Sequence, residues 1–213
     1  MSCMILAPSF QYKLMGPRTS VYFDKIHPSI PMIHKYRYQA SMDLCHGRRP
    51  PICLRYIMWC HSATVTDRYM DYQDIFYRRA RKYVEADEMT GRGEGLVSLA
   101  HAQCWLLIGT YEFKMMYFPR AWMSAGRAAR LVLMMGLNQV EGVSADAKQS
   151  LPLPEDWTEC EERRRTFWMA YCVDRYASMS TGWPLSINEK DVSTPLYEEG
   201  IVALSRPDAD LTP

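Results

Sequence analysis

Cysteine and histidine are the side chains in this sequence that could bind a metal ion. Cys53 and Cys60 are spaced to lie two turns apart on one helix face, and Cys45 and His46 precede them. A zinc site needs several thiolates or imidazoles that converge on one point, and the sequence has neither a CxxC pair nor an HExxH motif. Helix-borne cysteines are commonly buried, so we interpret these as free core thiols and expect no metal ligand and no cofactor in this chain.

Phosphate binding and catalysis are the other chemistries to consider. Residues 91–95 (GRGEG) look like a glycine-rich phosphate loop, but they follow a predicted helix instead of a strand and lack the Gly-Lys-Ser/Thr ending, so we interpret them as a hinge between helices. There is no G-x-S-x-G motif, and His101, on an apolar helix, is interpreted as a core or boundary histidine. We therefore expect no enzyme; a helical enzyme with an unrecognised site in the aromatic- and Met-rich interior is the remote alternative.

Two basic runs, residues 78–82 (RRARK) and 163–165 (RRR), could contact phosphate or direct nuclear import. Both lie inside predicted helices beside acidic residues, with Glu159 four positions before Arg163 and Glu161 four before Arg165. We interpret both runs as solvated helix faces with ion pairs. The net charge of +1 creates no overall field that would attract nucleic acid or a membrane surface, so DNA contact is expected to come from elsewhere.

The composition is that of a globular protein: 48% of the 213 residues are apolar and 23% are charged. Seven scattered cysteines, with no secretory signal at the N-terminus, predict a reducing compartment with free thiols. The longest apolar runs, residues 104–108 and 131–135, are far shorter than the about 20 residues that cross a bilayer, so we expect no membrane span.

Apolar residues at helical spacing predict five helices and no strand, and therefore an all-α fold, an irregular helical bundle with short extended connectors. Thr158 and Glu161 predict a T-x-x-E capping box at the start of the last helix. A short helix is expected over 19–26, followed by an extended, proline-broken stretch over 29–33. The alternative is an α-helical repeat scaffold, which small-residue helices such as 121–136 would suit but for which the sequence has no fixed period. The five expected helices run from Pro50 to about Ala63, Arg68 to Glu88, Val97 to Phe113, Pro119 to Gly136 and Thr158 to Thr181.

The last helix and its exit resemble the signature of the fungal-specific transcription factor domain, also called the middle homology or xylanolytic-activator regulatory domain. Matching blocks upstream, from Tyr22-Phe23 to Gly136-Leu137-Asn138, follow the family's order, so the resemblance covers roughly residues 18–199. The signature residues are Arg164, Arg165, Phe167, Trp168, Tyr171, Asp174, Arg175, Gly182 and Pro184.

The resemblance implies a nuclear regulator of transcription by RNA polymerase II whose all-α middle domain restrains or relays activation. In the family, a separate N-terminal binuclear zinc cluster reads DNA; none of the cysteines here forms the paired CxxC elements of that cluster, so zinc and DNA binding are placed on no residue of this chain. The implied partners are DNA through the missing module, a small-molecule inducer or a co-regulator protein, and a second copy in a homodimer. We expect residues 1–17 to be a disordered or artefactual leader, 18–199 the regulatory domain, truncated at its C-terminal end, and 200–213 a flexible tail.

The physical interpretation of the signature is structural. Arg164 or Arg175 is expected to bond carboxylates or the carbonyls that end a neighbouring helix, and Asp174 is expected to pair with an arginine one turn away. Gly182 is expected to supply a backbone conformation that other residues avoid, and Pro184 to direct the chain back across the bundle. These residues are thus predicted to orient helices instead of touching an effector.

Overall fold

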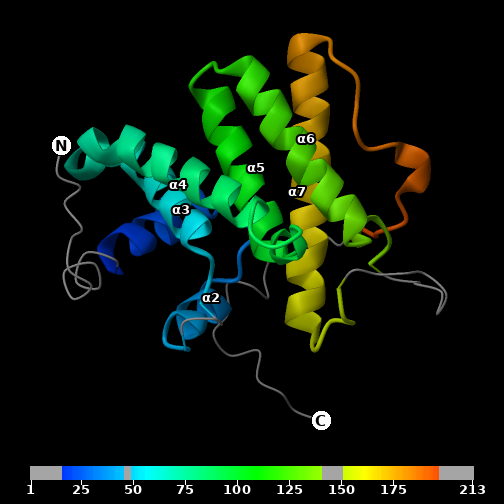
Figure 1. The fold of residues 1–213 in the computed structure, drawn as a ribbon, viewed down its shortest axis with the longest axis horizontal. Helices are drawn as coiled ribbons and strands as arrows, with labels where there is room; N and C mark the ends of the chain where they lie inside the picture. Colours follow the sequence, from blue (N-terminus) through cyan, green and yellow to red (C-terminus); the bar gives the residue numbers. More distant parts are fainter. Residues whose placement is uncertain (1–15, 46–48, 141–150, 197–213) are drawn as a thin grey trace.

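The chain is helical and contains no strand in the computed structural model, which describes residues 16–45, 49–140 and 151–196 (Figure 1). The all-α prediction is confirmed. No helix in these ranges is both long and apolar enough to cross a membrane. Residues 16–21 are α-helical. The α-helices that follow are α2 (Lys35–Met42), α3 (Ile52–Ala63), α4 (Gln73–Glu88), α5 (Leu99–Lys114), α6 (Phe118–Met134) and α7 (Trp157–Thr181). The shorter elements are the π-helix η1 (Tyr22–Ile26) and the 3-10 helices η3 (Asp67–Tyr72), η4 (Glu94–Leu96), η5 (Leu137–Gln139) and η6 (Glu189–Asp191).

Helix α5 lies at the centre of the bundle, as its apolar sequence predicts. It packs against α3, α4, α6 and α7, and its residues from 101 to 109 are all buried. The closest approach is to α6: a side chain added at Gly109 would meet the backbone at Ala125 and Ala121 within 3.5 and 3.6 Å. Small residues on both helices therefore allow the close α5–α6 contact.

Local sequence signals set most helix ends. The Ser98 hydroxyl accepts a hydrogen bond from the His101 backbone N–H and begins α5, and Pro119 occupies the first turn of α6. Gly136, just after α6, and Gly182, just after α7, both adopt left-handed conformations, with φ of 72° and 74°. The predicted starts and stops of these helices agree with the structure to within one or two residues.

The predicted capping box of α7 is wrong. The helix begins earlier, because the Asp156 carboxylate accepts a hydrogen bond at 2.7 Å from the Glu159 backbone N–H. Glu161, the expected reciprocal partner of Thr158, lies inside the protein instead, where it binds two arginines. A charged acceptor at the earlier position satisfies the free amides at the helix start, and the box at 158–161 is not needed.

The remaining differences lie toward the N-terminus. Helix α2 was not predicted; its low apolar content leaves no periodic stripe, and it begins where the His34 ring accepts a hydrogen bond from the Arg37 backbone N–H. Residues 27–33, expected to be partly extended, form turns, and residues 68–72 of the expected helix over 68–88 are 3-10 helix. Of the expected leader, residues 16 and 17 are helical and 1–15 lie outside the described residues, as does the expected tail at 200–213.

Candidate functional site at the exit of helix α7

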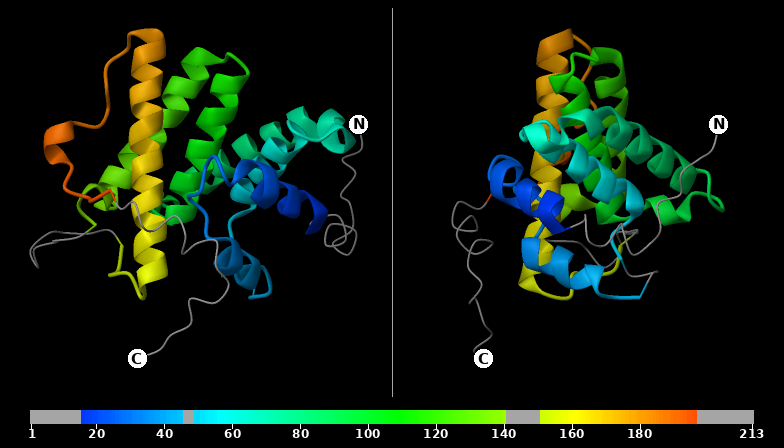
Figure 2. Two further views of the ribbon diagram at one scale, coloured as in Figure 1. Left: turned by 180° about the vertical axis from the view of Figure 1, so that it is seen from behind. Right: turned by 90° about the vertical axis from the view of Figure 1, so that its left-hand side faces the viewer.

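The chain leaves α7 through a sharp turn and runs back beside that helix (Figure 2). We call residues 182–195 the exit segment. Gly182 makes the turn with φ of 74°, a conformation that costs other residues free energy. The Ser178 hydroxyl donates a 2.6 Å hydrogen bond to the Trp183 carbonyl, and the Trp183 ring packs edge-on against Trp122 of α6 at 5.2 Å. Pro184 follows directly, so glycine and proline together aim the exit segment along the bundle.

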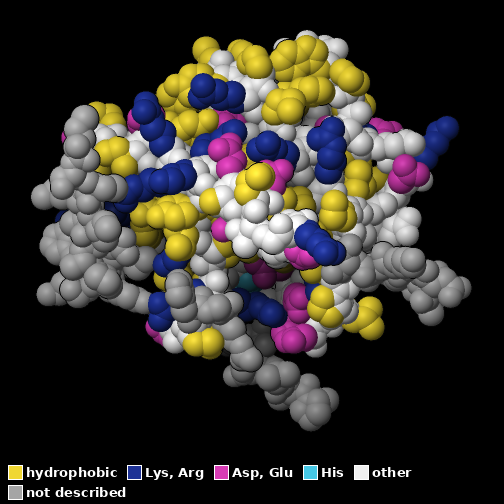
Figure 3. All heavy atoms as spheres, in the orientation of Figure 1, with side chains coloured by type: hydrophobic (Ala, Val, Ile, Leu, Met, Phe, Trp, Pro, Cys, Tyr) yellow, Lys and Arg dark blue, Asp and Glu magenta, His cyan; other side chains and the backbone are white. Residues whose placement is uncertain are grey.

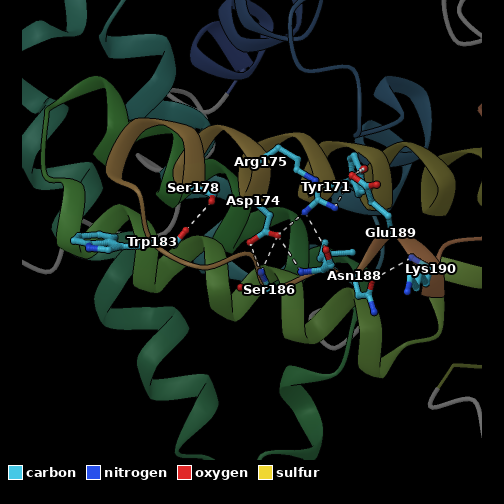
Figure 4. Close-up of polar contacts among 10 residues, drawn as sticks. Tyr171, Asp174, Arg175, Ser178, Trp183, Ser186, Asn188, Glu189 and Lys190 are labelled. Carbon is cyan, nitrogen blue, oxygen red and sulfur yellow. Dashed lines mark hydrogen bonds and ion pairs between the residues drawn. The ribbon is translucent and has the colours of Figure 1, made fainter.

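Asp174 holds the middle of the exit segment (Figure 4). Its buried carboxylate accepts hydrogen bonds at 3.0 Å from the backbone N–H groups of Ser186 and Ile187. The expected arginine one turn away is not its partner; its arginine contact is the adjacent Arg175, at 3.4 Å. The carboxylate binds these backbone N–H groups because Ser186 and Ile187 lie outside the helices, where no backbone carbonyl accepts their hydrogen bonds.

Arg175 and Tyr171 form a second attachment of the same segment. The Arg175 guanidinium donates a 2.9 Å hydrogen bond to the Ile187 carbonyl and lies 3.4 Å from the Glu189 carboxylate. It also lies over the Tyr171 ring, 4.3 Å from its centroid, while the Tyr171 hydroxyl lies 3.1 Å from Glu189. Arg175 thus bonds a carbonyl, as predicted, although the carbonyl belongs to the exit segment instead of a helix end.

The far end of the exit segment contacts both α7 and the residues after α6. The Trp168 indole N–H donates to the Pro195 carbonyl at 3.1 Å, next to the fully buried Phe167. The Thr194 hydroxyl donates to the Leu137 carbonyl at 2.7 Å, and the Asn138 carbonyl accepts the Thr194 backbone N–H. The exit segment therefore bridges α7 and η5, which the sequence places far apart.

The basic run at the start of α7 is not a solvated face, contrary to the prediction. Arg163 and Arg164 are buried; Arg163 pairs with Glu159 at 2.6 Å and donates to the Pro152 carbonyl, and Arg164 pairs with Glu161. Arg165 also pairs with Glu161, at 2.8 Å. Burial alone would raise the pKa of Glu159, but the Glu155 backbone N–H and Arg163 lower it overall. The predicted pairs of acid and arginine four residues apart are present, both within α7, but they are largely buried instead of lying on a solvated face.

Beside these arginines lies an apolar cavity of about 230 Å³. The signature residues Arg164, Arg165 and Trp168 contribute to its wall together with Met32 and Leu196. One end of the signature thus borders a hollow that can accept an apolar group, while the other end secures the exit segment.

Sequence reasoning missed a buried polar network between α4, α5 and α6. The fully buried Glu112 accepts hydrogen bonds from Tyr77 at 2.6 Å and from Ser124 at 2.7 Å, and it pairs with Arg81 at 3.0 Å. Arg81 belongs to the first basic run, so that run is only partly solvated. The single available signal was an acidic residue within the apolar stretch of α5, which nothing in its local spacing connects to Arg81.

These contacts suit a structural role. Carboxylate, guanidinium and indole groups of α7 bind backbone atoms of the exit segment, so their geometry depends on how the segment lies and little on its side chains. The arrangement therefore holds the segment mainly through its backbone.

Residues 19–201 match the family described as the fungal specific transcription factor domain. The chain is 39% identical to the pigment biosynthesis transcriptional activator pigB of Monascus ruber over 86% of its length, and 37% identical to the citrinin biosynthesis transcriptional activator ctnR of Monascus purpureus over 83%. It is 32% identical over 84% to an ascochitine biosynthesis cluster transcriptional regulator of Didymella fabae.

The all-α bundle with this signature on its last long helix is that of a transcription-regulator domain. The chain belongs to the fungal specific transcription factor domain family. It spans about a third of the length of these relatives, 33%, 30% and 31% in turn. No solved structure matches the chain at a significant level.

Proposed function

We propose that this chain is the regulatory domain of a nuclear transcription factor that controls transcription by RNA polymerase II. Membership of the family over residues 19–201 supports this, as do relatives that are named as transcriptional activators and regulators. Those relatives are named for the biosynthesis of a pigment, citrinin and ascochitine, so we propose the genes of a biosynthetic cluster as the target. A non-enzymatic role for this chain fits these names, which describe transcriptional activators and regulators.

DNA is read, in this proposal, by a zinc-cluster module that lies outside this chain. The relatives are about three times as long as the part that matches, and none of the seven cysteines here forms a CxxC pair. The net charge of +1 also gives this domain no overall field that would draw it to DNA. The regulatory domain then acts on a DNA-bound protein instead of on DNA.

The exit segment is the proposed relay, and its attachment to α7 is the observation that carries the proposal. Asp174 and Arg175 hold it through the backbone of Ser186 and Ile187, so a partner that binds the released segment would shift the equilibrium between held and released states. The signature residues act as positioning residues in this mechanism.

A co-regulator protein is the proposed partner, at the end of the bundle where the α5–α6 turn meets the end of α7. Apolar side chains gather there in Figure 3, which has the orientation of Figure 1. The Phe113 ring packs edge-on against the Tyr176 ring with 5.3 Å between centroids, and its centroid lies 6.4 Å from that of Phe118. Met116 and Met179, close to them in the chain, are 75% and 86% exposed. Exposed apolar groups that cluster in this way are typical of protein interaction surfaces.

A small apolar inducer is the second candidate signal, because a cavity of about 230 Å³ borders Trp168 and Arg165. The two signals make different predictions. Met179→Ser should weaken co-regulator capture and leave the inducer response intact. Leu196→Trp, which places a larger side chain in the wall of the cavity, should abolish only the response to an inducer.

The proposal is tested in an intact transcription factor that contains this chain. Replacing residues 19–196 by a flexible linker should change the inducer dependence of a reporter gene while DNA binding persists, since reading DNA is placed elsewhere. Asp174→Ala should change reporter control in the same direction, and the exposed Asp191→Ala should leave it unchanged. Unaltered inducer control after removal of the whole region would reject a regulatory role.

A further inference from the structure

Three potential metal ligands from three different helices meet at one point outside the α7 site. Cys53 lies in the first turn of α3, Asp87 in the last turn of α4 and His101 in the first turn of α5. Their ligand atoms all lie within 4.8 Å of one another. The Asp87 carboxylate is 3.8 Å from Cys53 Sγ and 3.1 Å from His101 Nε2.

These separations are close to those around a bound zinc ion. Nitrogen and oxygen ligands lie about 2.0–2.1 Å from zinc and sulfur about 2.3 Å, so tetrahedral ligands are roughly 3.3–3.6 Å from each other. The observed 3.1 and 3.8 Å bracket that range, and small side-chain movements would reach it. The set combines one thiolate, one imidazole and one carboxylate, which are the groups that zinc binds in proteins.

The surroundings orient the ligands. The Ser98 hydroxyl lies 2.7 Å from His101 Nδ1, which points Nε2 toward Asp87 and Cys53. Such an outer hydrogen bond to the second ring nitrogen is typical of metal-binding histidines.

An ion could reach the cluster from solvent. Asp87 and His101 line a cavity of about 390 Å³. Asp87 is 40% exposed, while Cys53 and His101 lie behind it at 0% and 9%. The carboxylate therefore stands at the entrance and the softer ligands lie inside.

We propose that Cys53, Asp87 and His101 form a binding site for one divalent cation of the zinc class. The Cys53 thiol releases its proton to solvent on binding, and the ion links the start of α3, the end of α4 and the start of α5. This site is independent of the proposed function and of any DNA-reading zinc cluster. Motif searches miss it because its ligands lie 34 and 14 positions apart instead of in a CxxC pair.

The test is titration of the reduced, metal-free full chain with Co²⁺, whose bond to a thiolate gives a charge-transfer absorption band. We expect one equivalent to bind with that band, Zn²⁺ to displace it, and Zn²⁺ alone to raise the melting temperature. Cys53→Ser should abolish the band. Asp87→Asn, which keeps the shape of a partly exposed side chain, should weaken Co²⁺ binding at least about 10–100-fold, since even outer-shell changes do so.

Cys172→Ser is the matched control, because Cys172 is an exposed cysteine on α7, away from the cluster. It should keep the band, the single equivalent and the zinc-dependent stabilisation. A wild-type chain with no thiolate band at one equivalent of Co²⁺ would overturn the proposal. So would an Asp87→Asn protein that folds, as judged by its helical circular dichroism, and binds Co²⁺ as tightly as the wild type.

Discussion

Replacing Asp174 by alanine removes the acceptor that holds the centre of the exit segment. The buried carboxylate accepts the backbone N–H groups of Ser186 and Ile187, each at 3.0 Å. A hydrogen bond to a charged group contributes about 1.5–3 kcal/mol, so losing both is expected to cost about 3 kcal/mol or more. Because about 1.4 kcal/mol is a tenfold change in an equilibrium constant, detachment of the segment should become at least about 100-fold more frequent.

Amide hydrogen exchange measures how strongly the carboxylate protects these two amides. The Ser186 and Ile187 amides should exchange about 100-fold faster in Asp174→Ala, while the amide of Ile57, in the core helix α3, should change less because the segment opens before the bundle unfolds. Asp191→Ala, an exposed change on the same segment, should leave both amides protected. If Ser186 and Ile187 exchange at wild-type rates in Asp174→Ala, the carboxylate does not hold the segment and the proposed relay loses its basis.

Changes at four further positions test other parts of the structure. Gly182→Ala should lower the free energy of unfolding by about 1 kcal/mol in a urea titration, because φ is 74° although no atom lies within 4 Å of the added carbon. Gly109→Ala should instead raise it by about 0.5–1 kcal/mol, since the new carbon meets α6 at an ordinary 3.5 Å, whereas Gly109→Leu should destabilise the bundle. Glu112→Ala should cost about 3 kcal/mol or more by the same titration, because the buried Tyr77 and Ser124 hydroxyls lose a charged acceptor while Arg81 keeps its second partner, Glu85; a loss no larger than that of an exposed carboxylate would contradict the network. Burial lowers the pKa of His61 to about 4 from its ordinary 6.5. The contribution of neutral His61 to the free energy of unfolding is therefore complete above pH 6.5 and is lost as the pH falls toward 4. Relative to His61→Gln, the wild type should lose about 2 kcal/mol between pH 7 and pH 5 in thermal melts.

The helices were predictable because their signals are local. Apolar residues three and four positions apart mark one face of α4, α5 and α6, and Ser98, Pro119 and Gly136 act within a turn of their own positions. Helix α2 lacks such a stripe and was missed. The start of α7 was misplaced because the Asp156 and Thr158 side chains compete for the same free amides at the helix start. Asp156, which also pairs with Arg37 at 2.7 Å, is the acceptor that binds them.

The residues of the candidate site were predictable, but their partners were not. The resemblance identified Asp174 and Arg175 as signature residues, and the charge pattern correctly paired Glu159 with Arg163. The burial of Arg163 and Arg164 was not predictable, because an i,i+4 pair has the same spacing whether the helix face is covered or open.

Amino-acid order alone therefore established an all-α chain, the position of its core helix and the segment that carries the family signature, since each depends on side chains within a few turns of one another. Tertiary packing decided which groups meet across the bundle. It brings Ser186 to Asp174, Arg81 to Glu112, and Cys53, Asp87 and His101 to one point. Such contacts join residues far apart in the chain, and their free energy appears only when burial removes water and leaves each polar group to find a partner in the protein.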